Sequence, residues 1–301
     1  MKRIAARIGE RVVSLSNLDK DLYPSYGFTK ADVLEYYRRI SPCILPHLRD
    51  RALTLKRYPD GIGGDHFFEK RCPAHRPGWV ETANIPQSGG EEMTVCLVNG
   101  LHTLMWVENL ASLELHVPLA RVSTPGIPDS MVFDLDPGEG ADVIDCGHIA
   151  LALRDILGDL GLECFVKTSG KKGLHVYVPL NREETTFDDT RRFSKTLAQV
   201  LERSYPQKVT SVMAKDARKG RVFINWSQNG PSNTTVCVYS LRARESPTVS
   251  LPLAWGEIER LTRQADPGEF QFIHSDALQR AERDGDLFSG LLELRQTLPG
   301  F

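Results

Sequence analysis

The chain has 301 residues, of which 41% are hydrophobic and 25% are charged, a composition typical of a globular protein with a substantial core. Its net charge of −2 argues against a general nucleic-acid coat protein, and no apolar run reaches the roughly 18 residues that a membrane span needs. Because the basic N-terminus is not followed by a long apolar stretch, we expect no signal peptide, no membrane association and a cytoplasmic location.

Two segments are locally basic. Residues 1–57 hold twelve Lys/Arg against six Asp/Glu, and residues 166–221 hold thirteen against six. Such patches suit a limited stretch of phosphate backbone, although solvated charged faces give the same counts. The six cysteines form no C-x-x-C pair, so we expect reduced thiols and neither a zinc module nor a disulfide framework. Cys72-x-x-His75 is the sole metal-like spacing.

The N-terminal part begins with a short basic strand around Val12 and Val13, followed by a polar segment that ends at Pro24. Thr29 then has the character of an N-cap for a helix that we expect to run through Ile40. Lys30 falls in the first turn of this helix, where the helix dipole disfavours a cation. An anion bound there would pair with both the Lys30 ammonium and the positive end of the helix dipole, so the position indicates a possible phosphate contact.

A strand around Leu53–Arg57 and a glycine-rich loop lead to the adjacent aromatics Phe67 and Phe68. These two rings could form a base-stacking platform or could pack in the core, and both interpretations stay open. Residues 79–106 suggest short strands around a polar turn at Ser88–Glu92. Residues 103–113 are apolar, and we expect a helix there that ends in the segment 114–118.

The segment Met131–Gly138 predicts a strand that carries two carboxylates and ends at Pro-Gly. Alternation places Asp134 and Asp136 on one face and directs Phe133 and Leu135 into a core. Two adjacent carboxylates repel each other unless a cation lies between them, and hard ions such as Mg²⁺ or Mn²⁺ prefer oxygen ligands. A solvated Asp pair at a Pro-Gly turn is the alternative.

The remaining pattern predicts a helix over residues 145–160, strands over 164–168 and 174–178, a helix over 187–204 and a strand over 220–226. A strand-like segment at 234–239 and a proline-broken linker with helices from Pro247 complete the chain. His175 lies on the second of these strands. A strand histidine is commonly structural, but beside Ser169 and the Gly170–Gly173 turn it could contact a triphosphate.

Several motifs occur in a specific order. They are S-N-L-D-K-D-L-Y-P, F-T-K-A-D-V, H-F-F-E-K-R-C-P-A-H, W-V-E-N-L-A-S-L-E-L-H-V-P, F-D-L-D-P-G, K-T-S-G-K-K-G-L-H-V-Y-V-P, R-K-G-R-V-F-I-N-W-S-Q-N and V-Y-S-L-R-A-R. From about Asn17 onward, the chain resembles the polymerase domain of bacterial ligase D and its stand-alone relatives in the archaeo-eukaryotic primase superfamily.

This resemblance implies an α/β (α+β) fold in a single primase-polymerase domain over residues 1–301. We expect an N-terminal α/β portion over about residues 1–120 and a C-terminal linker with helices over 251–301. Residues 121–250 would form the core, in which an antiparallel sheet brings Asp134, His175 and Asn225 together.

The resemblance also implies templated or template-independent addition of nucleotides, often ribonucleotides, to a 3′-hydroxyl at a 5′-phosphorylated break during non-homologous end joining. Two Mn²⁺ or Mg²⁺ ions would take part. The implied partners are double-strand-break ends, NTP or dNTP, Ku and a separate ligase, which would place the protein at the nucleoid.

Each motif assigns expected roles to residues. The metal ligands would be Asp134 and Asp136. The triphosphate would contact Ser169, His175 and Arg242, and the nucleotide would also contact His116 and Lys56. The 5′-phosphate pocket would contain Asn17, Lys20 and Lys30, and the bases near the downstream end would stack on Phe67 and Phe68.

Asn225 departs from the family pattern, because the resemblance leads us to expect Asp as a third metal carboxylate there. An amide offers one neutral oxygen, so the ion that activates the hydroxyl should bind more weakly. Whether the residue is natural or introduced, we predict intact DNA binding and severely reduced catalysis. A non-catalytic end-bridging module is the alternative. A D-x-D glycosyltransferase is a third interpretation, against which the basic segments and the paired aromatics argue.

Overall fold

The computed structural model describes residues 3–86 and 90–300, and the chain divides into two compact units. The first unit runs to Pro125 and also takes in Thr234–Val249 and Ile273–Gly285. The second comprises Gly126–Asn233, Ser250–Phe272 and the chain from Asp286. Among the described residues, no helix has the length and apolar character to cross a membrane.

The first unit is built on a four-stranded antiparallel sheet with the order β15-β9-β5-β6. Four two-stranded pairs, β1-β2, β3-β4, β7-β8 and β16-β17, accompany it. The elements are β1 (Arg3–Ile8), β2 (Arg11–Ser16), β3 (Asp21–Tyr23), β4 (Phe28–Thr29), α1 (Lys30–Leu48), β5 (Thr54–Arg57), β6 (Phe67–Glu69), β7 (Thr82–Pro86), β8 (Glu92–Cys96), α2 (Leu101–Asn109), β9 (Ser112–Val117), β15 (Thr235–Val236), β16 (Leu241–Arg242), β17 (Thr248–Val249) and α6 (His274–Asp284).

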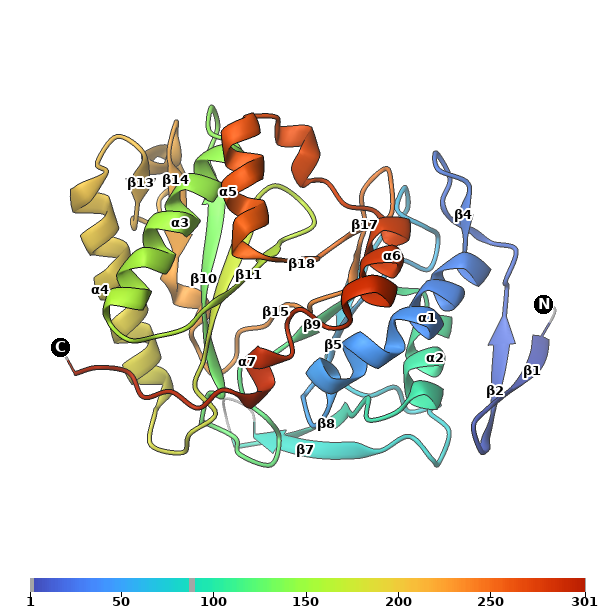
Figure 1. Cartoon of the computed structure of the whole chain (residues 1–301). Coiled ribbons are helices and arrows are strands. Elements are labelled where there is room, and N and C mark those ends of the chain that lie inside the picture. Colours follow the sequence, from blue (N-terminus) through green and yellow to red (C-terminus); the bar gives the residue numbers. More distant parts are fainter. Residues whose placement is uncertain (1–2, 87–89, 301) are drawn as a thin grey trace. The chain divides into compact units, whose positions relative to one another are not determined.

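The N-terminal strand predicted around Val12 and Val13 is the second arm of the β1-β2 hairpin (Figure 1). The strands expected within residues 79–106 are β7 and β8, which pair antiparallel. Of the predicted Ser88–Glu92 turn between them, Ser88 and Gly89 lie outside the described residues.

Helix α1 begins as its sequence predicts. Thr29 is the N-cap, and its side chain accepts from the N–H of Asp32, whose carboxylate accepts from the N–H of Thr29. This reciprocal capping box satisfies two N–H groups at the helix start. The predicted end at Ile40 is wrong, because the helix continues to Leu48.

Two prolines, Pro42 and Pro46, lie inside α1, and proline normally ends a helix because it leaves a carbonyl without its partner. Here the hydroxyl of Ser41 donates to the carbonyl oxygen of Arg38 at 2.8 Å, which is the acceptor that Pro42 cannot serve. Local side-chain bonding of this kind is invisible to a pattern of hydrophobic residues.

A second prediction is wrong at the junction of α2 and β9. The helix expected over residues 103–113 ends at Asn109, and Ala111 adopts a left-handed backbone with φ of +60°. The chain then forms β9. Glu114 and His116 therefore lie on a strand, two residues apart and on the same face.

Glu108 on α2 is an unusual buried group. It is fully buried, and neither carboxylate oxygen has a hydrogen-bond partner among the described residues. Burial raises its pKa well above the usual range, because a low dielectric disfavours the charged form. The side chain is therefore held neutral in the folded state.

We expect Glu108→Met to stabilise the protein at neutral pH by roughly 1–3 kcal/mol, the cost of an unpartnered buried polar group. Because the folded-state pKa is raised, the folded state must also keep the carboxyl protonated. This second cost is absent below the unfolded-state pKa and grows as pH rises toward the folded-state pKa. Urea unfolding at pH 5 and pH 8 should show a larger gap between variant and parent at pH 8. An equal gap at both values would contradict the assignment.

The second unit is built on a six-stranded sheet with the order β13-β14-β10-β12-β11-β18. All neighbours are antiparallel except β13 and β14. The elements are β10 (Ser130–Pro137), α3 (Val143–Asp159), β11 (Phe165–Thr168), β12 (Leu174–Pro179), α4 (Phe187–Ser204), β13 (Val209–Thr210), η1 (Lys215–Arg218), β14 (Val222–Asn225), η2 (Trp226–Gln228), β18 (Pro252–Leu253), α5 (Trp255–Gln264), η3 (Pro267–Phe270) and α7 (Gly290–Glu293).

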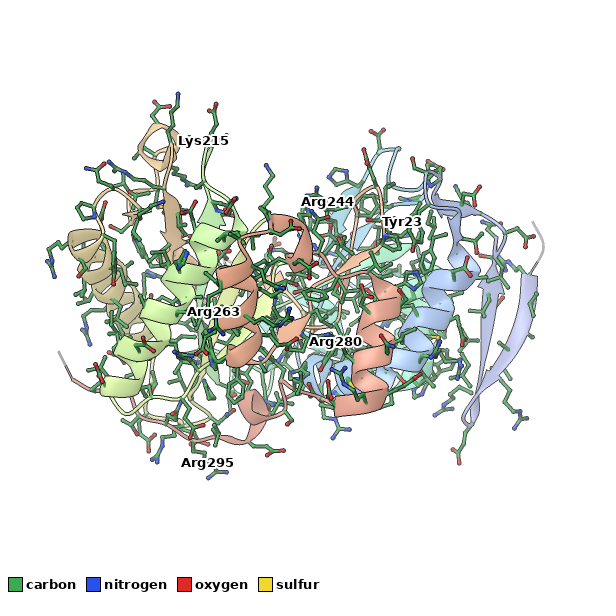
Figure 2. The ribbon with its side chains drawn as sticks, turned by 45° about the horizontal axis from the view of Figure 1, so that its top comes forward. Tyr23, Lys215, Arg244, Arg263, Arg280 and Arg295 are labelled. Atoms are coloured by element: carbon green, nitrogen blue, oxygen red, sulfur yellow. A yellow bond between two sulfur atoms is a disulfide. The ribbon has the colours of Figure 1, made fainter. Side chains whose placement is uncertain are left out.

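Strand β10 alternates as its sequence predicts. Phe133 and Leu135 are fully buried and belong to the core that includes residues of α3 and α4, while Asp134 and Asp136 face the other side of the sheet. The predicted helix over 187–204 is confirmed, and that over 145–160 is confirmed to within two residues. The segment that connects the parallel strands β13 and β14 contains η1, which begins at Lys215 (Figure 2).

The prediction of no disulfide is wrong. Cys72 and Cys96 form one, with their Cα atoms 4.9 Å apart. They are 24 residues apart in sequence, and they meet because β8 returns beside the segment that contains Cys72. The sulfur of Cys72 is thus occupied, so the Cys72-x-x-His75 spacing provides no thiolate for a metal. The other four cysteines are buried and do not form disulfides.

Candidate functional site

The six-stranded sheet brings three predicted site residues together. Asp134 on β10 is the cross-strand partner of His175 on β12 and of Asn225 on β14. His175 Nε2 lies 3.3 Å from Asp134 Oδ1, and Asn225 Nδ2 donates to Asp134 Oδ2 at 3.3 Å. The predicted convergence of residues about ninety apart in sequence is confirmed.

Lys167 is a member of this cluster that sequence reasoning missed. It pairs with His175 across β11 and β12, is 1% exposed, and its Nζ lies 3.0 Å from His175 Nδ1 and 2.6 Å from Ser250 Oγ. A charged ammonium only donates, so Nδ1 accepts and Nε2 carries the proton that faces Asp134. A lysine within the apolar strand F-V-K-T was the available signal.

The two carboxylates of β10 differ in their electrostatics. Asp136 is exposed near the end of β10, and partial desolvation among its neighbours, together with the charge of Asp134, raises its pKa to about 6. Burial also pushes the pKa of Asp134 upward. Electrostatic attraction to His175 and the hydrogen bonds from His175 and Asn225 outweigh the effect of burial, so the pKa of Asp134 is lowered. The ionised carboxylate of Asp134 thus disfavours ionisation of Asp136, and a cation between them would relieve this repulsion.

These oxygens suit a hard divalent cation in chemical type. Within residues 3–86 and 90–300, however, no group of three or more His, Cys, Asp or Glu is placed to hold a metal ion. Asn225 occupies the position where the resemblance leads us to expect a third carboxylate. Its Oδ1 accepts from Ser227 at 2.7 Å, and its Nδ2 donates to Asp134. It therefore adds no anionic oxygen beside the two aspartates.

Ser169 organises the turn between β11 and β12. Its Oγ accepts from the N–H groups of Lys171 and Gly173 at 3.2 and 3.1 Å. Gly173 is required here, because a Cβ would lie 2.0 Å from the carbonyl oxygen of Leu135. This close approach lets the turn adjoin β10 between its two aspartates.

A second cluster lies within the first unit, around Glu114. This carboxylate is 1% exposed; His116 Nε2 lies 3.1 Å, Arg242 Nε 3.3 Å and Lys56 Nζ 3.8 Å from it. The ring of Phe68 lies 5.8 Å from that of His116 and 5.4 Å from the Lys56 ammonium. Four predicted nucleotide or DNA contacts thus surround one residue that was not predicted.

The signal for Glu114 was its position two residues before His116 on the same face of a strand. It was missed because this segment had been assigned to the end of a helix. Burial lowers the pKa of His116, against the opposing hydrogen bond to Glu114, so this ring is held neutral. Glu114 then balances the charges of Lys56 and Arg242.

We expect Glu114→Ala to lower the free energy of unfolding by roughly 3–5 kcal/mol, because it leaves two buried cations without their carboxylate. Urea denaturation would measure this loss. The double variant with Lys56→Met removes one of those cations, so it should be more stable than the sum of the single changes predicts. Simple additivity would show that the two groups are not coupled.

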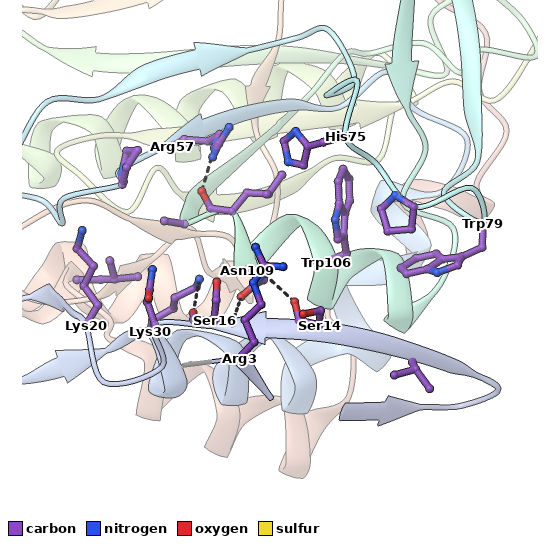
Figure 3. Close-up of a pocket in the computed structure, with 17 residues that line it drawn as sticks. Arg3, Ser14, Ser16, Lys20, Lys30, Arg57, His75, Trp79, Trp106 and Asn109 are labelled. Atoms are coloured by element: carbon purple, nitrogen blue, oxygen red, sulfur yellow. Dashed lines mark hydrogen bonds between the residues drawn. The ribbon is translucent and has the colours of Figure 1, made fainter. Parts of the chain in front are cut away.

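The predicted phosphate residues line a third feature, a cavity of about 470 Å³ in the first unit (Figure 3). Asn17, Lys20 and Lys30 all contribute to its wall. Lys30 is 4% exposed, and its Nζ donates to the carbonyl oxygen of Ser16 at 2.7 Å. Burial, followed by the charges of Lys20 and Arg57, lowers its pKa to about 8.

The neighbouring cations are already paired. Lys20 contacts Asp60 at 2.7 Å, and Arg57 contacts Glu69 at 3.0 Å. In the described part of the chain, Lys30 has no such carboxylate. A bound anion would stabilise a buried ammonium next to two other cations, so this pocket is a candidate anion site.

The helix end itself is not the anion contact that the sequence suggested. The N–H groups of Lys30 and Ala31 donate to the carbonyl oxygens of Lys20 and Leu18 at 2.8 and 3.0 Å. The start of α1 is thus already satisfied by backbone. An anion in this pocket would be held by side chains.

Phe67 and Phe68 lie on β6 with 45% and 58% of their surface exposed. Core packing of this pair, one of the two interpretations of the sequence, is therefore wrong. The guanidinium of Arg57 lies 5.1 Å from the ring of Phe67. Exposed rings next to cations are available for stacking on bases.

Comparison with known proteins gives one consistent match. Residues 29–288 match the family model described as the LigD primase-polymerase domain.

The chain belongs to the LigD primase-polymerase domain family.

Relatives extend this finding. The chain is 40% identical over 290 residues to the multifunctional non-homologous end joining DNA repair protein LigD of Mycobacterium tuberculosis, covering 94% of this chain and 37% of that protein. It is 32% identical over 247 residues to the bifunctional LigD of Bacillus subtilis, covering 82% and 39%. The chain thus spans less than two fifths of these relatives.

A solved structure supports the fold. The polymerase domain of Mycobacterium tuberculosis ligase D in complex with DNA matches with a TM-score of 0.86 and 40% identity, covering 93% of this chain and 97% of that one. The predicted α/β class with antiparallel sheets is confirmed. Family membership also removes the basis for a glycosyltransferase interpretation of the Asp134-x-Asp136 motif.

Proposed function

We propose that this LigD-family chain adds nucleotides to a 3′-hydroxyl at DNA breaks that carry a 5′-phosphate, as part of non-homologous end joining. The observation that carries the proposal is the Asp134–Asp136 pair beside His175 in a member of this family. The matched polymerase domain was solved in complex with DNA, which supports a DNA end as the substrate.

The 5′-phosphate of the downstream strand would bind in the cavity of Lys30. Its negative charge would offset the cost of the buried Lys30 ammonium, and Lys20 and Asn17 would contribute from the same wall. The exposed rings of Phe67 and Phe68 would stack on bases near that end.

The incoming NTP or dNTP would contact the groups expected from the sequence. Lys56 and Arg242 offer cations whose charge Glu114 balances before the nucleotide arrives. Ser169 would contribute a hydroxyl for a phosphate oxygen, and His175 a ring held in one tautomer by Lys167. The use of ribonucleotides and of templates belongs to this proposal.

Asp134 and Asp136 would hold Mn²⁺ or Mg²⁺, which when bound would activate the attacking hydroxyl and stabilise the pyrophosphate that leaves the nucleotide. With Asn225 donating to Asp134, this chain would hold the hydroxyl-activating ion weakly and catalyse slowly. We propose Ku and a separate ligase as its partners at the nucleoid, with the ligase sealing the extended strand.

The second candidate function is a non-catalytic module that bridges 5′-phosphorylated ends. It is favoured by the hydrogen bond from Asn225 to Asp134, which fills the position where the resemblance leads us to expect a third carboxylate. The buried cations around Glu114 disfavour it, because a bridge does not require a triphosphate site.

The experiment is extension of a gapped duplex with ribonucleotides and Mn²⁺, using downstream strands with a 5′-phosphate or a 5′-hydroxyl. The proposal expects slow addition that depends on the metal and increases with the phosphate. Phosphate-dependent DNA binding without any addition, by the parent or by Asn225→Asp, would favour the bridging function.

A further inference from the structure

The pocket of Lys30 extends well beyond its cationic end. Its volume of about 470 Å³ falls in the range of roughly 300–1,000 Å³ that takes whole small-molecule ligands. Figure 3 shows Lys20 and Lys30 toward one end, with Trp106 and Trp79 toward the other. A phosphate alone would leave the aromatic end unused.

The aromatic end has its rings arranged around the cavity. His75 lies with its ring centroid 6.4 Å from that of Trp106, and Trp79 packs on the edge of His102 at 5.2 Å. His75 is exposed and Trp79 is half-buried. Both therefore retain surface that a ligand can contact.

The segment that carries His75 and Trp79 is fixed at both ends. Cys72 is bonded to Cys96, and the N–H of Leu97 donates to the carbonyl oxygen of Glu81 at 3.0 Å. A wall held in this way contributes to binding without a large ordering cost.

Asn109 lies between the two ends of the pocket, and its amide is engaged by β2. Its Oδ1 accepts from the N–H of Ser16 at 2.9 Å, and its Nδ2 donates to the carbonyl oxygen of Ser14 at 3.1 Å. This amide could have formed hydrogen bonds with a base edge, but both of its polar atoms are bonded to β2 instead. The aromatic end would recognise a base by its π-face and tolerate all four bases.

We propose that this pocket binds a nucleoside together with the phosphate to which it is linked. The phosphate lies at Lys30, and the base stacks on the half-buried ring of Trp79, with the exposed His75 lining the same pocket. Trp106 is buried and contributes to the wall of the pocket. The assignment of the phosphate to a DNA end rests on the proposed function. Two sources supply this chemistry, the terminal nucleotide of the strand or an adenosine linked to its 5′-phosphate through a pyrophosphate.

The test measures binding of the whole chain to labelled duplexes by fluorescence anisotropy. The four downstream ends are a 5′-phosphate on an intact nucleotide, a 5′-phosphate on an abasic one, a 5′-hydroxyl and a 5′-adenylated phosphate. Trp79→Ala removes the ring, and Trp79→Phe is the matched variant that keeps a stacking surface.

If the terminal nucleotide is the ligand, removing its base weakens binding by roughly five- to a hundredfold, as expected for one stacked base. Trp79→Ala then weakens the intact end by the same factor and leaves the abasic end unchanged. If the adenosine is the ligand, the adenylated end binds more tightly than the phosphorylated one by that factor, and Trp79→Ala removes the difference. Trp79→Phe retains most of either effect.

The proposal is overturned if neither the base nor the adenosine changes the affinity of the parent chain, or if Trp79→Ala weakens all four ends equally. Equal binding of the 5′-phosphate and 5′-hydroxyl ends would instead overturn the phosphate site of the proposed function. The two failures appear in different pairs of duplexes and are therefore distinguishable.

Discussion

Asn225→Asp is expected to raise the rate of nucleotide addition by roughly a hundredfold or more. In the present chain, the amide nitrogen of residue 225 donates to Asp134 and its oxygen accepts from Ser227. A carboxylate would add the missing anionic ligand, and changes even in the outer shell of a metal site alter affinity or activity by roughly 10- to 100-fold.

The same substitution should change stability in a metal-dependent way. Without divalent ions, a third carboxylate beside Asp134 adds repulsion, so the unfolding temperature of Asn225→Asp should fall below that of the parent. Mn²⁺ should restore it, because a ligand that binds the folded state stabilises that state. Thermal unfolding with and without Mn²⁺ measures this effect.

Asn225→Ala is the matched control, since it removes the hydrogen bond to Asp134 without adding a charge. It should gain neither activity nor metal-dependent stability. If Ala and Asp raise the rate equally, the hydrogen bond itself limits the reaction, and the missing carboxylate does not.

Lys30→Met is expected to weaken binding of a 5′-phosphorylated end by roughly 10- to 100-fold, the value of a charge-assisted hydrogen bond. Binding of a 5′-hydroxyl end should stay the same. Anisotropy titrations of both duplexes measure the two constants, and Lys20→Met serves as a comparison, since Lys20 is more exposed and already paired with Asp60.

The sign of the stability change separates this role from a structural one. The folded-state pKa of Lys30, about 8, is below its unfolded-state value, so the charged lysine destabilises the fold fully below pH 8. This cost declines as pH rises from about 8 toward the unfolded-state pKa. Lys30→Met should therefore be at least as stable as the parent at pH 7, with an advantage that shrinks at pH 9.

A Lys30→Met variant that is clearly less stable at pH 7 would show that the hydrogen bond to Ser16 outweighs the cost of burying the charge. The lysine would then be a structural residue. Loss of affinity for both kinds of DNA end together would point to the same conclusion.

Much of the second unit could be read from the sequence, because its signals are local. Thr186 caps α4 with a reciprocal bond to Asp189, and the strict alternation along β10 separates Phe133 and Leu135 from the two aspartates. The pairing of Asp134 with Asn225 is different. It joins two residues that are 91 positions apart in the sequence, and only the resemblance predicted it.

The errors have a common physical origin in contacts that a short window does not contain. The bond from Ser41 that sustains α1 past Pro42 depends on a side-chain rotamer. The left-handed backbone at Ala111 is adopted by a residue other than glycine, so the sequence contains no glycine that would predict the turn. The disulfide joins Cys72 to Cys96 on β8, 24 residues further along the chain.

The two site residues that were missed, Lys167 and Glu114, have similar surroundings. Both are charged and almost fully buried. Each lies beside a predicted site residue on the same face of its own sheet. Their roles depend on cross-strand neighbours, which a single strand does not reveal. Once strand register is known, a buried charge opposite a predicted site residue becomes a direct signal.

The most direct test of the account is the rate of nucleotide addition across a one-nucleotide gap with a 5′-phosphorylated downstream strand, measured for the parent, Asn225→Asp and the double variant Asn225→Asp with Asp134→Ala. The account predicts slow addition by the parent, a gain of roughly a hundredfold with Asp at 225, and loss of that gain when Asp134 is removed. Full activity of the double variant would contradict it, because nucleotide transfer would then not depend on the carboxylates of β10.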